Sequence, residues 1–190
     1  MNSTAPKFAG YEDLFDLPGN IVGEIIHGQL ITHPRPAPKH AVASSSMGGE
    51  LIGPFQKGRD GPGGWWILDE PELHLHPHIL VPDLAGWRRE RMPNLPTTAY
   101  FEIVPDWVCE VLSPGTARVD RIQKMPIYAQ CGVQHLWLID PDLRTLEAYE
   151  LVNQRWQLQA SLQNDDKVSV MPFAAISFSL AELWPPETTG

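Results

Sequence analysis

The stretch that decides the fold is DWVCEVLSP, residues 106–114. The apolar content of residues 104–112 predicts a strand at the centre of a sheet, covered on both faces. Side chains alternate along a strand, so Glu110 shares its face with Val108 and Leu112. A carboxylate buried among aliphatic side chains is costly unless a cation lies beside it. Glu110 is therefore predicted to belong to a functional site.

A second acid interrupts another apolar run, VPDL at residues 81–84. Taken alone, Asp83 is better interpreted as a strand-end acid that faces water. Two acids on neighbouring strands, however, are how a protein builds a site for a hard cation from oxygen ligands. Asp83 and Glu110 together therefore indicate metal-assisted hydrolysis.

Length and composition favour one domain over residues 1–190, with residues 1–10 as a flexible arm. No apolar run approaches the roughly 18 residues that span a bilayer, and the first residues lack a signal-peptide layout. We therefore expect a cytoplasmic protein without a membrane partner. Cys109 and Cys131 are expected to be free thiols. The net charge of −9 argues against broad electrostatic attraction to nucleic acid, but it allows a small basic surface or a metal-neutralised cleft.

Hydrophobic periodicity and turn residues predict the elements of the fold. In chain order these are a hairpin over 21–32 with Gly28 in its turn, a loop over 33–38, a helix over 43–55, strands over 65–75 and 79–87, the strand over 104–112, a helix over 120–131 closed by Gly132, strands over 134–140, 143–151 and 156–162, and a helical turn over 179–183. Gly53-Pro54 should end the first helix early. The order predicts an α/β fold of the α+β type, with a mixed, mostly antiparallel central sheet flanked by helices.

Three further residues attract attention because of their neighbours. Lys124 shares a helix face with Tyr128 and Cys131, although alone it would be a solvated lysine. Asp120 lies one turn before it and is expected to form an ordinary surface ion pair. Glu24 lies amid aliphatic residues, as Glu110 does. Jointly, these acids and the lysine form a set of charged groups in apolar surroundings.

A competing metal site is suggested by HLHPH, residues 74–78. Alternating histidines on one strand face could bind zinc or iron. The proline favours a hairpin turn instead, in which exposed histidines cost nothing. Ser113 could suggest a nucleophile, but no Gly-x-Ser-x-Gly elbow surrounds it.

An ordered set of motifs runs along nearly the whole chain, from about Tyr11 to Leu183. It comprises Glu24, His40, VPD at 81–83, PDWVCEVLSP at 105–114, Asp120, Lys124, Tyr128, GV at 132–133 and WLIDP at 137–141. This set resembles the Uma2 family, bacterial proteins abundant in cyanobacteria that belong to the restriction-endonuclease-like PD-(D/E)XK nuclease superfamily. The resemblance implies that fold and a nuclease activity.

The resemblance also implies roles for individual residues. Asp83 and Glu110 would ligate one Mg²⁺ or Mn²⁺ ion, helped by the Val111 carbonyl. The superfamily lysine usually follows the second acid by two positions, where this chain has Leu112, and Lys124 on the next helix matches the relocated lysine. Glu24 matches an N-terminal acid that could hold the metal directly or through water.

Other matches have less defined roles. His40 and Tyr128 occupy recurrent positions near the cleft. Two groups of arginines could contact the DNA backbone or lie in solvated segments: Arg88, Arg89 and Arg91, and Arg118 with Arg121.

The sequence departs from the family pattern at three positions. His27 stands where an aspartate is common, Gly23 replaces a usual aromatic residue, and Pro126 removes a helix hydrogen-bond donor just after Lys124. Pro126 must therefore lie either in the first turn of its helix or at a bend, which bears on where Lys124 points.

The resulting expectation is a Mg²⁺-dependent endonuclease that hydrolyses phosphodiester bonds of DNA. The alternative is a catalytically inactive nuclease-fold protein with a DNA- or protein-binding accessory role. A homodimer would suit an enzyme that cuts both strands of a duplex.

Overall fold

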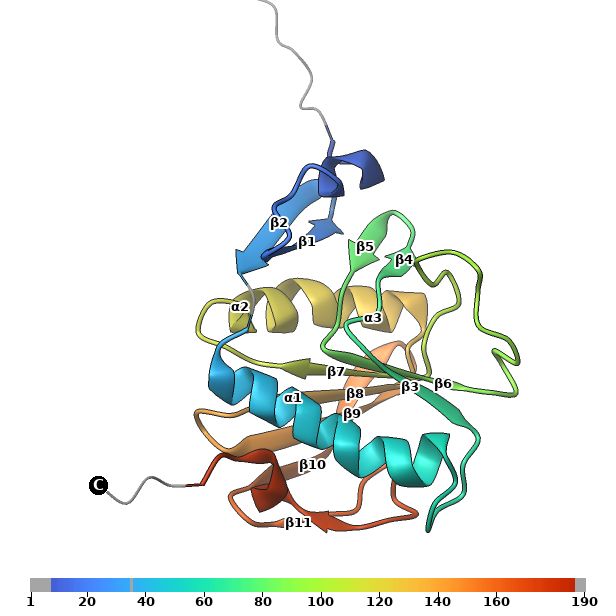
Figure 1. The fold of residues 1–190 in the computed structure, drawn as a ribbon, viewed down its shortest axis with the longest axis vertical. Coiled ribbons are helices and arrows are strands. Elements are labelled where there is room, and N and C mark those ends of the chain that lie inside the picture. The colour runs from blue at the N-terminus through green and yellow to red at the C-terminus, as the bar shows by residue number, and fades with distance from the viewer. Residues whose placement is uncertain (1–7, 35, 187–190) are drawn as a thin grey trace, which may run out of the picture.

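The central feature of the fold is a six-stranded sheet in the order β10-β9-β8-β7-β6-β3 (Figure 1). The structure, a computed structural model, describes residues 8–34 and 36–186. The strands of this sheet are β3 (Trp65–Asp69), β6 (Leu84–Arg88), β7 (Trp107–Val111), β8 (His135–Asp140), β9 (Thr145–Val152) and β10 (Arg155–Gln163). β7 and β8 pair in parallel, whereas the other pairings are antiparallel. The predicted mixed, mostly antiparallel sheet is confirmed.

A second sheet of four strands lies beyond one edge of the first, in the order β2-β1-β5-β4. Its strands are β1 (Ile21–Ile26), β2 (Gln29–Pro34), β4 (Leu73–Leu75) and β5 (His78–Leu80). The β1–β2 hairpin turns at His27 and Gly28, whose φ angles are 51° and 72°. Gly28 has the positive φ that the sequence predicted, and β2 extends into the expected proline loop because Pro34 still pairs with Ile21.

The two long strands predicted over 65–75 and 79–87 are wrong in one respect: each is broken in two. β3 and β6 pair within the central sheet from Trp65↔Arg88 to Asp69↔Leu84, and β4 and β5 pair within the second sheet. The breaks face each other, since the N–H of Glu70 donates to the carbonyl of Asp83 at 3.0 Å. Pro71 and Pro82 lie in these breaks and cannot donate to a ladder. Asp83 consequently stands at the joint between the sheets.

One helical run covers one face of the central sheet. α1 (Pro38–Leu51) continues into a π-helical segment, η2 (Ile52–Gln56). The expected end at Gly53-Pro54 is therefore wrong, because the wider π turn accepts a proline without breaking the run. The predicted i+4 stripe is confirmed by burial, at Ala43, Met47, Leu51 and Phe55.

The helical run on the other face consists of α2 (Ala117–Val119), the π-helical η3 (Asp120–Lys124) and α3 (Met125–Cys131). It begins three residues before the expected start and ends, as predicted, at Gly132 in the left-handed conformation with φ 86°. Pro126 lies in the first turn of α3, directly after η3. The proline therefore needs no sharp kink, and Lys124 closes the π turn.

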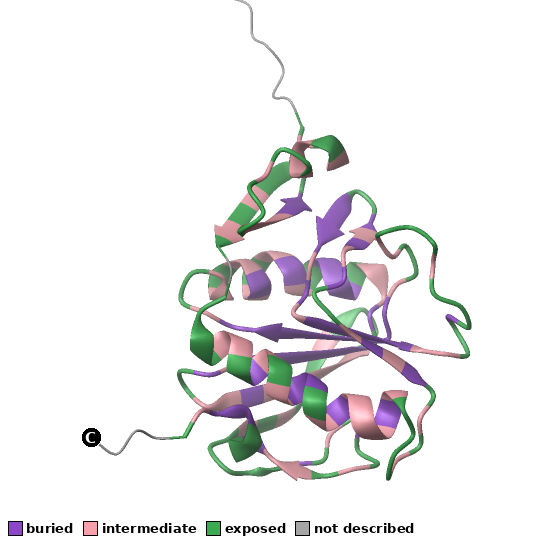
Figure 2. Ribbon diagram, viewed as in Figure 1, coloured by how far each residue is buried: buried purple, intermediate pink, exposed green. Residues whose placement is uncertain are grey.

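The core forms two apolar clusters, separated by the central sheet. Trp107, Cys109 and Val111 of β7 belong to the cluster on the α1 side, whereas Val108 and Leu112 belong to the cluster on the α3 side. β7 is buried along its whole length (Figure 2). Glu110 alternates with Cys109 and Val111, and its side chain meets Lys124 and Tyr128 on the α3 side.

Four smaller elements complete the described part of the chain. Two are the 3₁₀ turns η1 (Tyr11–Leu14) and η4 (Leu180–Leu183), and η4 confirms the helical turn predicted over 179–183. The other two are β11 (Lys167–Val168) and β12 (Phe178–Ser179), a short strand pair that the sequence did not predict. Residues 1–7 of the expected arm lie outside the described residues, and the N–H of Ala9 donates to the Gly28 carbonyl at 2.8 Å. Cys109 and Cys131 are free. Across the described residues, no helix has the length and apolar character needed to cross a membrane.

The conformation of Gly132 predicts opposite effects of two glycine substitutions. An added Cβ meets no atom within 4 Å at either Gly132 or Gly49, so packing does not distinguish the two sites. Gly132→Ala should lower the free energy of unfolding by about 1–2 kcal/mol, because an L-residue resists positive φ. Gly49→Ala, within α1, should raise it by about 0.5–1 kcal/mol. Urea unfolding followed by tryptophan fluorescence measures both, and equal effects would contradict the assignment of the helix end.

Candidate active site

A cleft of about 480 Å³ opens where the two sheets, α1 and α2 meet. Its walls come from β1–β2, the start of α1, the joint between β5 and β6, the end of β7 and the helical run that begins at Ala117. Among the residues that line it are His40, Glu70, Asp83, Glu110, Val111, Asp120 and Lys124. The structure therefore brings Asp83, Glu110 and Lys124 into one cleft, as the sequence predicted.

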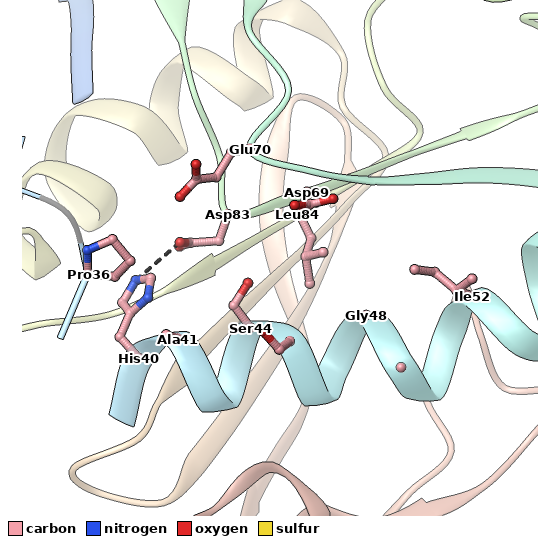
Figure 3. Close-up of a pocket in the computed structure, with 12 residues that line it drawn as sticks. Pro36, His40, Ala41, Ser44, Gly48, Ile52, Asp69, Glu70, Asp83 and Leu84 are labelled. Atoms are coloured by element: carbon pink, nitrogen blue, oxygen red, sulfur yellow. Dashed lines mark ion pairs between the residues drawn. The ribbon is translucent and has the colours of Figure 1, made fainter. Parts of the chain in front are cut away.

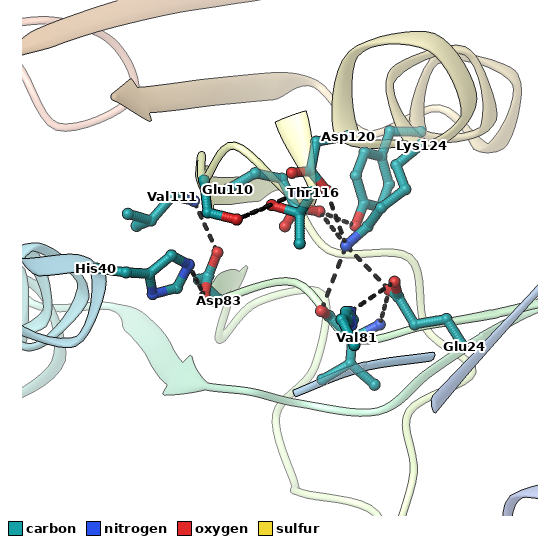
Figure 4. A network of polar contacts seen from close by, with 12 residues as sticks. Glu24, His40, Val81, Asp83, Glu110, Val111, Thr116, Asp120 and Lys124 are labelled. Carbon is teal, nitrogen blue, oxygen red and sulfur yellow. Dashed lines mark hydrogen bonds and ion pairs between the residues drawn. The ribbon is translucent and has the colours of Figure 1, made fainter. Parts of the chain in front are cut away.

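Asp83 is held by two donors that fix its carboxylate at the cleft (Figure 4). The backbone N–H of Val111 donates to Oδ2 at 2.7 Å, and His40 Nε2 lies 3.1 Å from Oδ1. Pairing between β6 and β7 starts at Leu84↔Cys109, so the Asp83 side chain accepts an N–H that no β6 backbone group reaches. This contact fixes Asp83 against the strand that carries Glu110.

His40 comes from the first turn of α1 and lies against Asp83 (Figure 3). Burial lowers the pKa of its imidazole, but the hydrogen bond and charge of Asp83 outweigh burial and raise that pKa overall. Nδ1 of His40 is buried without a hydrogen-bond partner. The imidazole is thus suited to orient Asp83.

Glu110 is 3 % exposed and points into the α3 side of the sheet. Its Oε1 accepts a hydrogen bond from the Tyr128 hydroxyl at 2.6 Å and lies 2.8 Å from Lys124 Nζ. Burial raises the pKa of Glu110 well above its usual range, and Lys124 opposes that shift. A cation beside Glu110 therefore stabilises the ionised form of its carboxylate.

Lys124 is 2 % exposed and contacts several oxygens at once. Its Nζ lies 2.9 Å from Glu24, 2.8 Å from Glu110 and 3.7 Å from Asp120. It also donates to the Val81 carbonyl at 3.4 Å. Burial alone would lower the pKa of Lys124, but Glu110 and then Glu24 reverse the shift and raise it well above its usual range. The amine is accordingly charged.

The prediction that Asp120 forms an ordinary surface ion pair is wrong, because its side chain is 4 % exposed and lines the cleft. Burial raises the pKa of its carboxyl, although Lys124 opposes the change. Its position four residues before Lys124 was the sequence signal that the two side chains would meet.

Two residues of the site were not predicted from the sequence. They are Glu70, which lines the cleft, and His33, whose Nε2 lies 3.4 Å from Glu24. A glutamate before a proline at the end of β3 was the signal for Glu70.

The donor set of the cleft fits a small divalent cation. Asp83, Glu110, Asp120 and the nearby Glu24 outnumber the single lysine, and carboxylate oxygens are the ligands that Mg²⁺ and Mn²⁺ prefer. Within residues 8–34 and 36–186, no three His, Cys, Asp or Glu side chains form a ready metal cage. Mg²⁺ commonly takes only one or two carboxylates and keeps waters or substrate oxygens, so the lack of such a cage is compatible with a Mg²⁺ site.

The arginines differ in what they contact. Arg88 and Arg89 stack over Trp65 and Trp66, and Arg91 pairs with Asp106 at 2.8 Å. Arg118 is exposed beside the cleft-lining turn at 113–116, and Arg121 Nη1 lies 2.7 Å from Glu147.

The histidines at 74–78 do not converge on a common point. His74 Nε2 lies 2.8 Å from Glu72, and its ring stacks on Tyr100 at a centroid distance of 3.8 Å. His78 Nδ1 instead accepts the backbone N–H of His27 at 3.2 Å. These separate contacts weigh against the histidine metal site.

Comparisons with known proteins agree with the fold described above. The model of the Uma2 family, described as "Putative restriction endonuclease", matches residues 11–182. A solved structure titled as a "putative nuclease" from Anabaena variabilis ATCC 29413 is similar, with 26 % sequence identity and a TM-score of 0.72, over 90 % of this chain and 95 % of that one. No curated protein matches.

Removal of the buried lysine charge should have a pH-dependent effect on stability. In Lys124→Met the remaining acids lose their cation, and breaking such a buried pair costs about 3–5 kcal/mol. The pKa values of Glu110 and Asp120 are already raised in the folded protein, and loss of Lys124 raises them further. The folded variant then binds more protons than the unfolded chain, so its stability should fall as pH rises from 5.5 to 8.

Urea unfolding at both pH values measures this effect. Arg121→Met is the matched control, because it removes a cation from a partly exposed pair and should cost about 1 kcal/mol or less at either pH. A Lys124→Met deficit of the same size at pH 5.5 and pH 8 would contradict the charge assignment.

Proposed function

We propose, on the premise that this chain belongs to the Uma2 family, that it is a metal-dependent endonuclease that hydrolyses phosphodiester bonds of DNA. One observation carries the proposal: Asp83 and Glu110 line the same cleft, and the amine of Lys124 lies 2.8 Å from Glu110. An acid pair with an adjacent lysine suits phosphodiester hydrolysis, since the reaction needs a cation site and a positive group near developing negative charge.

Asp83 and Glu110 would hold Mg²⁺ or Mn²⁺, with the Val111 carbonyl as a further oxygen donor. A bound ion would polarise the phosphate and lower the pKa of a nearby water. The contacts of Val111 N–H and His40 keep Asp83 oriented for this role. Tyr128 does the same for Glu110 through its hydroxyl.

Lys124 would offset the charge that develops on the phosphate. Its amine is already surrounded by Glu24, Glu110 and Asp120, so it acts from a fixed position rather than by reaching out. Arg118, which follows the cleft-lining turn at 113–116, and Arg121 would contact the DNA backbone. We also propose a cytoplasmic location and, for cleavage of both strands, a homodimer.

A second candidate is a catalytically inactive relative with a DNA- or protein-binding accessory role. The observation that favours it is the enclosure of Lys124, which is 2 % exposed and contacts three acids. Such an ion-pair network is also what a purely structural site would contain. Binding of Mn²⁺ measured by calorimetry separates the two candidates, because a structural network predicts no heat that depends on Asp83.

Nicking of supercoiled plasmid DNA in Mg²⁺ or Mn²⁺ tests the proposed activity. Asp83→Asn, Glu110→Gln and Lys124→Met should each lower the rate by about 10²-fold or more, because each removes a charge next to the reacting phosphate. Asp142→Asn is the control: it removes a surface carboxylate that pairs with Lys39 at 2.9 Å and should leave the rate unchanged.

EDTA should abolish nicking by the wild-type protein. Equal rates for the wild type and all three cleft variants would assign the activity to a contaminant and remove the support for the proposal.

A further inference from the structure

We infer that Glu24 is a positioning residue and not a metal ligand: its carboxylate fixes the Lys124 amine and the Val81 backbone, and thereby joins the β1–β2 hairpin to the active site. The inference rests on the proposed function for its catalytic consequence. It replaces the expectation, drawn from the family resemblance, that Glu24 could hold the metal.

The contacts of Glu24 use both of its carboxylate oxygens. Oε1 accepts the backbone N–H of Val81 at 2.7 Å and lies 2.9 Å from Lys124 Nζ, whereas Oε2 lies 3.4 Å from His33 Nε2. The side chain is 1 % exposed, and Glu24 is not among the residues that line the cleft. In Figure 4 its carboxylate points at the Lys124 amine. Both acids contact protein groups, but Asp83 lines the cleft and is 16 % exposed, whereas Glu24 is buried outside the cleft lining.

Two of the groups that Glu24 contacts, Val81 and Lys124, belong to the two halves of the active site. Val81 is two residues before Asp83, in the break between β5 and β6. Lys124 also donates to the Val81 carbonyl. Glu24 and Lys124 together therefore bind both backbone polar groups of Val81, its N–H and its carbonyl. A displacement of Glu24 would consequently move the lysine and the segment that leads to Asp83.

The hairpin that carries Glu24 is also a wall of the cleft, through Val22, Thr32, His33 and Pro34. Its backbone pairs with the rest of the second sheet at Ile25↔Ile79. The buried ion pair adds a strong polar link between this wall and the helical run with Lys124. A substrate that binds in the cleft and displaces the hairpin would therefore also displace the Lys124 amine, through its contact with Glu24.

Three measurements on Glu24→Gln, Glu24→Asp and the control Glu72→Gln test the inference. Glu72 is matched because it lies directly before β4 of the second sheet and its carboxylate pairs with a histidine, His74, at 2.8 Å. The measurements are calorimetry with Mn²⁺ alone, steady-state plasmid nicking, and hydrogen–deuterium exchange of the peptide that contains Val81.

The expected order of the variants differs between a positioning residue and a metal ligand. Glutamine keeps an oxygen in place for Val81 and Lys124, so Glu24→Gln should retain more kcat than Glu24→Asp, whose oxygens retreat by one methylene. Glu24→Asp should lose about 10²-fold in kcat, as a misplacement of 1 Å can cost, with KM little changed. Glu24→Gln should bind Mn²⁺ as the wild type does, whereas Asp83→Asn should weaken binding by about tenfold or more.

Exchange at Val81 should be faster in Glu24→Asp than in the wild type and unchanged in Glu72→Gln, because only the first loses the acceptor of the Val81 N–H. Weaker Mn²⁺ binding by Glu24→Gln, or unchanged kcat and exchange in Glu24→Asp, would overturn the inference. A wild-type protein that neither binds Mn²⁺ nor nicks DNA would instead refute the proposed function, and the exchange measurement would still decide whether Glu24 holds this segment.

Discussion

The structure depends on one buried positive charge, that of Lys124. The amine contacts carboxylates from three separate elements: Glu24 of β1, Glu110 of β7 and Asp120 of η3. Each acid alone would be costly to bury, as would the lysine, and the contacts are favourable only when the group is complete. The second sheet, the central sheet and the α2–α3 run are therefore tied at one point, which is also the candidate active site.

The excess of acids over lysine gives the cleft its chemical character. Burial raises the pKa of Glu110 and Asp120, so the cleft would gain from another cation. Asp83, fixed by Val111 N–H and His40, lines the same cleft as Glu110. The buried acids thus lower the stability of the folded protein at the place where the proposed reaction needs a metal, as is common at functional sites.

Sequence patterns predicted those parts of the fold that depend on local conformation and on burial. The apolar run around Glu110 predicted a central strand, the i+4 stripe from Ala43 predicted a core helix, and Gly28 and Gly132 marked positive φ. The predictions failed where tertiary context decided. Pro54 lies within a π turn instead of ending the helix, and Asp120, which has the spacing of a surface pair, is buried in the cleft beside Lys124.

By itself, the sequence determined the identity of the charged groups and the strands and helices that carry them, because periodicity and the cost of burying a carboxylate can be read along the chain. Only the tertiary structure decided how these groups meet. The break that separates β5 from β6 places Asp83 beside Val111, and the hairpin carries Glu24 across to Lys124, 100 residues away in the chain. Such contacts depend on how two sheets and two helical runs pack together, and no local pattern encodes that packing.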